Sequence, residues 1–255
     1  MFTFEKVQNP HIYLFGAGGT GGFALEYLTR LFANSEQRVT IDIYDGDTVE
    51  LKNLKRQNFT TDDLDLNKAT ALVKRMQKQV PTPPTFNIHT QYITDEDELT
   101  ADILMSTEDD ETAIIISAVD NISTRRLINS VIDELTESLS IIGIDSGNDD
   151  QGGQVVIFGK AEQKDILGNS NQIILPNMLK LFPEIDIIKD ERDENPGIVS
   201  VCAEESEAKP QAMMANVRNG ELIANLVYQV SQNEPIAYNI WKSSIMGNTT
   251  GEQKV

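Results

Sequence analysis

Cysteine and histidine are scarce in this 255-residue sequence, which contains one cysteine, Cys202, and two histidines, His11 and His89. A single cysteine excludes a disulfide bond within the chain. It also excludes a structural zinc site built from cysteines alone, because such a site needs several thiolates. We therefore expect no zinc among the cofactors.

Basic residues and long apolar runs are also few. Forty acidic residues against 21 basic ones give a formal net charge of -19, which disfavours binding to nucleic acid or to an anionic membrane. No apolar stretch reaches the roughly 18 residues that span a bilayer, and the start, MFTFEKVQNP, lacks the pattern of a targeting signal. We expect a cytoplasmic protein, and any anionic ligand would need a local basic pocket.

What the sequence does contain is an alternation of strand-like and helix-like segments over its first 145 residues. This alternation is typical of a parallel sheet wrapped by helices. The expected strands cover residues 12–15, 38–45, 85–93, 112–120 and 139–147, and the expected helices cover residues 21–33, 67–80 and 123–138.

The remainder of the chain has a different pattern. GGQVVIFGK, residues 152–160, predicts an antiparallel strand, residues 187–197 an acidic loop, and residues 210–232 a long helix. We expect one α/β domain over residues 1–255, with a Rossmann-like, mostly parallel sheet and helices on both faces. Its nucleotide-binding core would cover residues 1–150, with an antiparallel extension over residues 151–255.

A glycine-rich loop joins the first strand to the first helix, in the segment HIYLFGAGGTGG. Gly16, Gly18 and Gly21 form a G-x-G-x-x-G pattern, and Gly19 lies within it. Such a loop lets backbone N–H groups approach a phosphate at the positive end of a helix dipole. Some folds use the same pattern only for tight packing, but the strand and helix around it here favour nucleotide binding.

The second strand ends at Asp45, and a polar loop with several cations follows it. The Asp45 carboxylate suits a ribose diol in NAD and ATP enzymes alike, and a turn aspartate is the alternative. The loop and the next helix contain Asn53, Arg56, Gln57 and Lys68. Arg56 offers phosphate oxygens a planar fork and Lys68 a point charge, which favours a triphosphate over a nicotinamide ribose. A solvated basic loop is the alternative reading.

Four blocks of the sequence, GAGGTG, DGDTVELKNLKRQ, NKA and DNISTRRLIN, resemble the ThiF/MoeB/HesA family, whose members are relatives of the ubiquitin-activating enzymes. The blocks occur in family order over about residues 11–160, and GGQVVIF and VCAEE extend the resemblance faintly. In its single-domain size the chain also resembles the small ThiF-like proteins of PRTRC systems.

The resemblance implies an adenylyltransferase. Members of the family join ATP to the C-terminal Gly-Gly carboxylate of a small ubiquitin-like or sulfur-carrier protein as an acyl adenylate, with release of pyrophosphate. Carried over to this sequence, the four glycines would lie against the nucleotide and Asp45 would hold the ribose. Asn53, Arg56 and Lys68 would grip the phosphates, so positioning and charge neutralisation would supply most of the catalysis.

The resemblance also implies that Asp120 coordinates Mg²⁺, with Asn121 beside it. A carboxylate at the C-terminal end of a buried strand faces the crevice where open α/β sheets bind ligands, and it suits a hard cation. Helix capping is the alternative role at this position, for which Asn121 or Ser123 suffices. Arg125 matches the family spacing, and packing or pairing with an acidic neighbour is its alternative role.

Cys202 lies in VSVCAEES, at a place comparable to that of the cysteine that takes the activated partner in some family members. A helix N-terminus would favour its thiolate, whereas Glu204, Glu205 and Glu207 would disfavour it. A small packed side chain is the alternative.

Two features depart from the family. The CxxC zinc pairs of many relatives are absent, and no arginine precedes Arg30, although relatives of the MoeB kind reach across a homodimer with an N-terminal arginine. A homodimer is still implied by the resemblance. Either Lys6 substitutes for that arginine or the partner subunit contributes nothing to the site, and both cases are compatible with slow or lost adenylation.

Three other functions stay open. An NAD-dependent oxidoreductase would share the glycine loop and Asp45, but would leave the cations and Asp120 unexplained. A ThiF-like module could bind a nucleotide or partner without turnover. Adenylation could also serve a peptide or the modification of a tRNA, although the acidic surface makes a tRNA less attractive.

Overall fold

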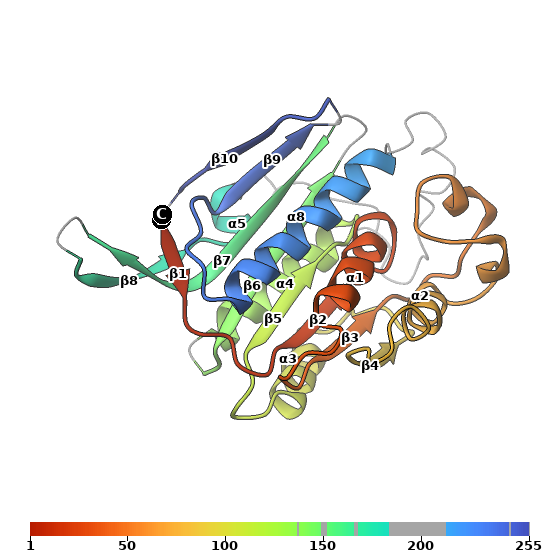
Figure 1. Ribbon diagram of the computed structural model, residues 1–255, viewed down its shortest axis with the longest axis horizontal. Helices are drawn as coiled ribbons and strands as arrows, with labels where there is room; N and C mark the ends of the chain where they lie inside the picture. The colour runs from red at the N-terminus through yellow and green to blue at the C-terminus, as the bar shows by residue number, and fades with distance from the viewer. Residues whose placement is uncertain (137, 149–151, 166–167, 184–212, 245, 255) are drawn as a thin grey trace.

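The computed structural model describes residues 1–136, 138–148, 152–165, 168–183, 213–244 and 246–254 (Figure 1). Five parallel strands form its core: β2 (His11–Phe15), β3 (Thr40–Tyr44), β4 (Thr85–His89), β5 (Ala113–Ser117) and β6 (Ile141–Asn148). Five strands pair antiparallel beside it: β1 (Phe2–Phe4), β7 (Gly152–Lys164), β8 (Ser170–Leu175), β9 (Ile240–Ser244) and β10 (Thr249–Glu252).

All ten strands belong to one sheet. Its order is β10-β9-β7-β6-β5-β2-β3-β4, and β1 and β8 both pair with β7. The inner parallel strands β2 and β5 are buried on both faces, as in Ile114, Ile115 and Ile116 of β5, each 0% exposed, whereas the edge strand β4 is largely exposed. The predicted α/β architecture with a parallel core and an antiparallel C-terminal extension is confirmed.

Helices cover both faces of the sheet. One face carries α1 (Gly19–Leu31), α2 (Lys68–Met76) and α8 (Met213–Ser231), and the other carries α3 (Glu96–Ser106), α4 (Ile122–Leu135) and α5 (Met178–Leu181). In Figure 1, α1 and α8 lie side by side across the front of the sheet. They can approach closely because Gly220 has no side chain: a Cβ there would lie only 2.8 Å from Cβ of Phe23.

The chain reverses its direction across the sheet at β2. The connection through α1 leads from β2 to β3, whereas β5 lies on the other side of β2 and leads through α4 to β6. Right-handed crossovers that leave in opposite directions bring their helices to opposite faces. Sheets of this kind bind ligands outside the C-terminal ends of the strands on either side of such a reversal, which here are β2 and β5.

Several elements were missed or misjudged from sequence. The strand expected over 85–93 ends at His89, and α3 was not expected, although Asp95 caps it by accepting a hydrogen bond from the Glu98 N–H at 2.9 Å. The predicted helix over 210–232 is observed as α8, while the acidic loop at 187–197 lies outside the described residues. In the described ranges, no helix combines the length and the apolarity needed to cross a membrane.

Candidate functional site

The glycine loop turns sharply at the end of β2. Gly16 has a φ of +90°, and its N–H donates to the Tyr44 carbonyl at 2.9 Å. A Cβ at Gly16 would lie 2.7 Å from the carbonyl oxygen of Ala118, and one at Gly21 would lie 1.8 Å from the carbonyl oxygen of Gly16. Both positions require glycine, because any side chain would displace backbone at the point where β2, α1 and the segment after β5 meet.

Asp45 holds this loop in place from the end of β3. Its Oδ2 accepts a hydrogen bond from the Ala17 N–H at 2.7 Å, and its Oδ1 accepts one from the Asp47 N–H at 2.8 Å. Burial raises the pKa of the Asp45 carboxyl, although the Lys68 ammonium opposes that rise. A carboxylate offers about four lone-pair sites, so the two hydrogen bonds leave acceptor capacity for a ligand hydroxyl.

Lys68 is the first residue of α2, and it is paired within the protein. Its Nζ lies 2.7 Å from Oδ2 of Asp47, and its side chain is 10% exposed. Burial lowers the pKa of Lys68, but the nearby carboxylates of Asp45, Asp47 and Asp120 outweigh this effect and raise it. The structure therefore brings Lys68 and Asp120 into one electrostatic neighbourhood, and the pairing with Asp47 was not foreseen from sequence.

Arg56 and Gln57 follow the short helix η1 (Leu51–Lys55). The Arg56 side chain is half-buried, and it makes no ion pair within the described residues. The Gln57 amide lies beside the glycine loop, with its Nε2 3.7 Å from the position of a Cβ on Gly18. Its Oε1 is buried without a hydrogen-bond partner in the described part of the chain. Such an orphaned polar atom is a candidate ligand contact.

Asn53 shapes the turn that presents these two residues. It is 3% exposed, and its Oδ1 accepts a hydrogen bond from the Glu50 N–H at 2.8 Å. Its carbonyl oxygen accepts from the N–H groups of Arg56 at 3.1 Å and Gln57 at 2.9 Å. Its observed contacts are thus those of a capping residue, and direct contact with phosphate stays a prediction.

Asp120 is exposed and lies between β5 and α4. Asn121, next to it, caps α4 by accepting a hydrogen bond from the Thr124 N–H at 2.8 Å. Helix capping was the alternative role weighed for Asp120, with Asn121 or Ser123 as a sufficient cap, and Asn121 is the residue that caps α4. Among the residues that the structure describes, no three His, Cys, Asp or Glu side chains form a group that could hold a metal alone.

Arg125 links the segment after β5 to the end of β6. Its Nη2 donates to the carbonyl oxygens of Val119 and Ser146, at 2.9 Å each, and its Nε lies 3.2 Å from Oδ1 of the fully buried Asp145. Burial raises the pKa of the Asp145 carboxyl, and the Arg125 guanidinium opposes that rise. The pairing role weighed for Arg125 is the one observed.

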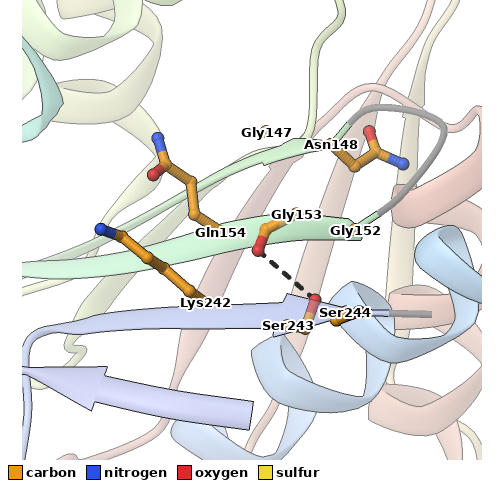
Figure 2. Close-up of a pocket in the computed structure, with 8 residues that line it drawn as sticks. All are labelled: Gly147, Asn148, Gly152, Gly153, Gln154, Lys242, Ser243 and Ser244. Carbon is orange, nitrogen blue, oxygen red and sulfur yellow. Dashed lines mark hydrogen bonds between the residues drawn. The ribbon is translucent and has the colours of Figure 1, made fainter. Parts of the chain in front are cut away.

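An open depression of about 550 Å³ lies where β6 ends, β7 begins and β9 ends (Figure 2). Because β6 runs parallel to β2 and β5, the depression lies at the same edge of the sheet as the glycine loop. Figure 2 shows the Gln154 and Lys242 side chains extending to the same side of β7 and β9. The depression is lined by Gly147, Asn148, Gly152, Gly153, Gln154, Lys242, Ser243 and Ser244.

Sequence reasoning did not find this depression, because its lining comes from three strands and β9 was not predicted. Its three glycines beside polar residues are the only local signal. Cys202, the candidate for partner transfer, lies outside the described residues.

Comparison with known proteins gives a consistent result. Residues 3–232 match the ThiF family. Ubiquitin-like modifier-activating enzyme 5 of Oryza sativa subsp. japonica is 25% identical over 147 residues, which cover 56% of this chain and 34% of that protein. SUMO-activating enzyme subunit 2 of Dictyostelium discoideum is 29% identical over 161 residues, 63% of this chain and 22% of that protein. The matches thus span about a third or less of these relatives.

Solved structures share the fold. E. coli MccB with ATP superimposes with a TM-score of 0.59 and 18% identity, covering 98% of this chain and 66% of that chain. The E. coli tRNA N6-threonylcarbamoyladenosine dehydratase TcdA, in complex with ATP, superimposes with a TM-score of 0.54 and 16% identity, covering 88% and 86%.

Proposed function

The chain belongs to the ThiF family, and on this basis we propose that it is an ATP- and Mg²⁺-dependent adenylyltransferase. Its substrate is the C-terminal carboxylate of a small ubiquitin-like or sulfur-carrier protein that ends in Gly-Gly. The observation that carries the proposal is that Lys68 lies in the electrostatic neighbourhood of Asp45 and Asp120, while Gln57, the residue after Arg56, lies beside Gly18 of the glycine loop. The names of the activating-enzyme relatives, and the ATP in the MccB and TcdA structures, support it.

The reaction is an exchange at the α-phosphorus of ATP. An oxygen of the partner's carboxylate forms a new bond to that phosphorus, and the bond to the bridging oxygen breaks, so that pyrophosphate leaves with the electron pair. Negative charge develops on the transferred and leaving groups, and fixed cations that face it lower the barrier. Arg56, unpaired in the described residues, supplies one such cation, and Lys68 supplies the other by exchanging Asp47 for phosphate.

Asp120 fits a Mg²⁺ ion that arrives with ATP. Mg²⁺ prefers oxygen ligands, and in nucleotide sites it is held by one or two carboxylates together with phosphate oxygens. An exposed carboxylate within electrostatic reach of Lys68, without a preformed cage in the described residues, suits this mode. When bound, Mg²⁺ would neutralise phosphate charge, while Asp120 orients it.

The partner's C-terminal segment needs an approach to the same sheet edge. The depression between β6, β7 and β9 offers open polar space there. A homodimer in the cytoplasm completes the proposal, with Cys202 as a candidate for accepting the activated partner.

Exchange of labelled pyrophosphate into ATP tests the proposal, with candidate Gly-Gly proteins added to the purified chain. Asp120→Ala should lower the exchange at least a hundredfold, because a lost metal ligand removes transition-state charge stabilisation. Asp109→Ala is the matched control, since Asp109 is also exposed but precedes β5 at the opposite edge of the sheet. Exchange that Asp120→Ala leaves unchanged would remove Asp120 from the mechanism, and ATP binding without exchange would favour the non-catalytic module.

A further inference from the structure

Asn216 joins three segments that are distant in sequence. It lies in the first turn of α8 and is 1% exposed. Its Nδ2 donates to the carbonyl oxygen of Arg56 at 3.0 Å. Its Oδ1 accepts from Nδ2 of Asn148 at 2.5 Å and from the hydroxyl of Thr20 at 3.5 Å. One amide therefore ties the loop that carries Arg56 to the N-terminal turn of α1 and to the end of β6.

The amide occupies space that the glycine loop leaves free. A Cβ at Gly19 would lie 2.3 Å from Nδ2 of Asn216, so any side chain there would push the amide away from Arg56. Gly19 therefore has two roles: it leaves room for the Asn216 amide, and it belongs to the loop that we expect to face the nucleotide.

The hydrogen bond from Asn216 holds the backbone carbonyl of Arg56, whose N–H is held as well. The Arg56 N–H already donates to the carbonyl of Asn53 at 3.1 Å, and Asn216 binds its carbonyl. With both groups held, the direction of the Arg56 Cα–Cβ bond is set before any ligand arrives. Preorganisation of this kind strengthens the binding of a charged ligand, because less freedom is lost when the contact forms.

We propose that Asn216 is a positioning residue for phosphate recognition, which acts by holding the Arg56 loop against the glycine loop. This proposal rests on the proposed function, since it presumes that Arg56 binds a triphosphate. Asn216 does not itself touch the nucleotide, and its effect passes through Arg56.

Asn219 provides a matched control on the same helix. It is 0% exposed, and its Nδ2 donates to Oγ of Ser146 and to the Gly147 carbonyl, at 3.1 Å each. Its Oδ1 accepts from the Ser243 hydroxyl at 2.9 Å. Replacing either asparagine by alanine removes a buried amide from α8, but only Asn216 contacts the Arg56 loop.

The test measures ATP affinity by titration calorimetry for the wild type, Asn216→Ala, Asn219→Ala, Arg56→Ala and the double variant Asn216→Ala/Arg56→Ala. We expect Asn216→Ala to weaken ATP binding about tenfold and Asn219→Ala to change it less than about twofold. In the Arg56→Ala background, Asn216→Ala should add less than about twofold, because its route of action is gone. Hydrogen exchange of residues 51–59 should quicken in Asn216→Ala and not in Asn219→Ala.

Two results would overturn the inference while the proposed function stands: wild-type affinity in Asn216→Ala, or an equal loss with and without Arg56. A wild-type chain that binds no ATP would overturn both proposals, and the wild-type titration alone reveals that case. If Asn216→Ala does not fold, Asn216→Ser, which is too short to reach the Arg56 carbonyl, replaces it with the same expectations.

Discussion

Two buried polar clusters lie against the sheet, and they differ in kind. In the ionisable cluster, formed by His11, Asp42 and His89, each oxygen of Asp42 lies 2.6 Å from an imidazole Nε2. In the amide cluster, formed by Asn216 and Asn219, only neutral groups meet. The ionisable cluster gains strength from charge but depends on protonation. The amide cluster has no such dependence, which suits a contact that sets geometry beside a site.

Charge shifts the pKa values within the ionisable cluster. Burial opposes ionisation of Asp42, but hydrogen bonds from His11, His89 and Asn87 prevail and lower its pKa to about 2. Burial also opposes a proton on His11, but the carboxylates of Asp42 and Glu111 raise its pKa above 6.5. Folding therefore favours the charged form of both partners, relative to the unfolded chain.

Removing the central carboxylate should have the largest effect. Asp42→Ala leaves Nε2 of His11 and Nε2 of His89 without their acceptor, while Nδ1 of His11 keeps Glu111. Breaking a buried ion pair in this way costs about 3–5 kcal/mol in the free energy of unfolding. Urea denaturation measures the change. Asp109→Ala, an exposed control, should stay within about 0.5 kcal/mol of the wild type. A loss below about 1 kcal/mol in Asp42→Ala would show that the cluster contributes little.

The pH dependence of the free energy of unfolding should distinguish the two clusters, with the second-largest effect. The pKa of Asp42 falls from 3.8 to about 2 on folding, so its stabilisation is complete above 3.8 and is lost as the pH falls toward 2. That shift corresponds to about 2 kcal/mol. Because the pKa of His11 is raised from 6.5, its stabilisation is complete below pH 6.5 and is lost as the pH rises through the folded-state value.

The contribution of the ionisable cluster is therefore greatest between about pH 4 and 6.5. Unfolding followed by fluorescence from pH 2 to 9 should show this maximum in the wild type and a flatter profile in Asp42→Asn. An unchanged profile in Asp42→Asn would assign the pH dependence to other groups.

Asn219→Ala should be less costly, and its cost should not vary with pH. The change leaves Ser146, Ser243 and the Gly147 carbonyl short of a partner, which costs about 1–3 kcal/mol. Denaturation at pH 5 and at pH 8 measures it. A cost, measured against the wild type at the same pH, that differs between pH 5 and pH 8 would contradict the contrast between the clusters.

The smallest effect is expected at the rim of the ionisable cluster. The His89 side chain is 32% exposed, so His89→Ala leaves Asp42 with His11 and Asn87 and should cost about 1 kcal/mol. The loss of stacking on Tyr44, whose ring centroid lies 3.9 Å away, is part of that cost. A thermal unfolding midpoint lowered as far as in Asp42→Ala would show that His89 contributes as much as the central carboxylate, which contradicts the prediction.

Features that arise locally were predictable from sequence. The apolar strands, the glycine loop at the end of β2 and the long helix α8 each carry their signal within a few residues. The segment 96–106 carried a signal too, because Asp95 and Glu98 have the spacing of a helix cap, and it was overlooked.

Contacts between distant segments could not be predicted in the same way. The pair of Lys68 with Asp47 depends on how α2 packs against the end of β3, and the contact of Asn216 with Arg56 joins residues 160 apart in the chain. Spacing gives no indication of either contact, since both arise only when the sheet and the helices assemble. The residue types at the site were thus predictable, and their partners were not.

The pair of Lys68 and Asp47 has a consequence for any triphosphate that enters. An ammonium group already held by an internal anion has lost much of its hydration, so a ligand meets a cation that is dry and oriented. Binding then exchanges one anionic partner of Lys68 for another, and the affinity reflects how much more strongly phosphate interacts with Lys68 than Asp47 does. Ligands of low charge would not displace Asp47 from Lys68, so the site would select ligands by charge before it selects them by shape.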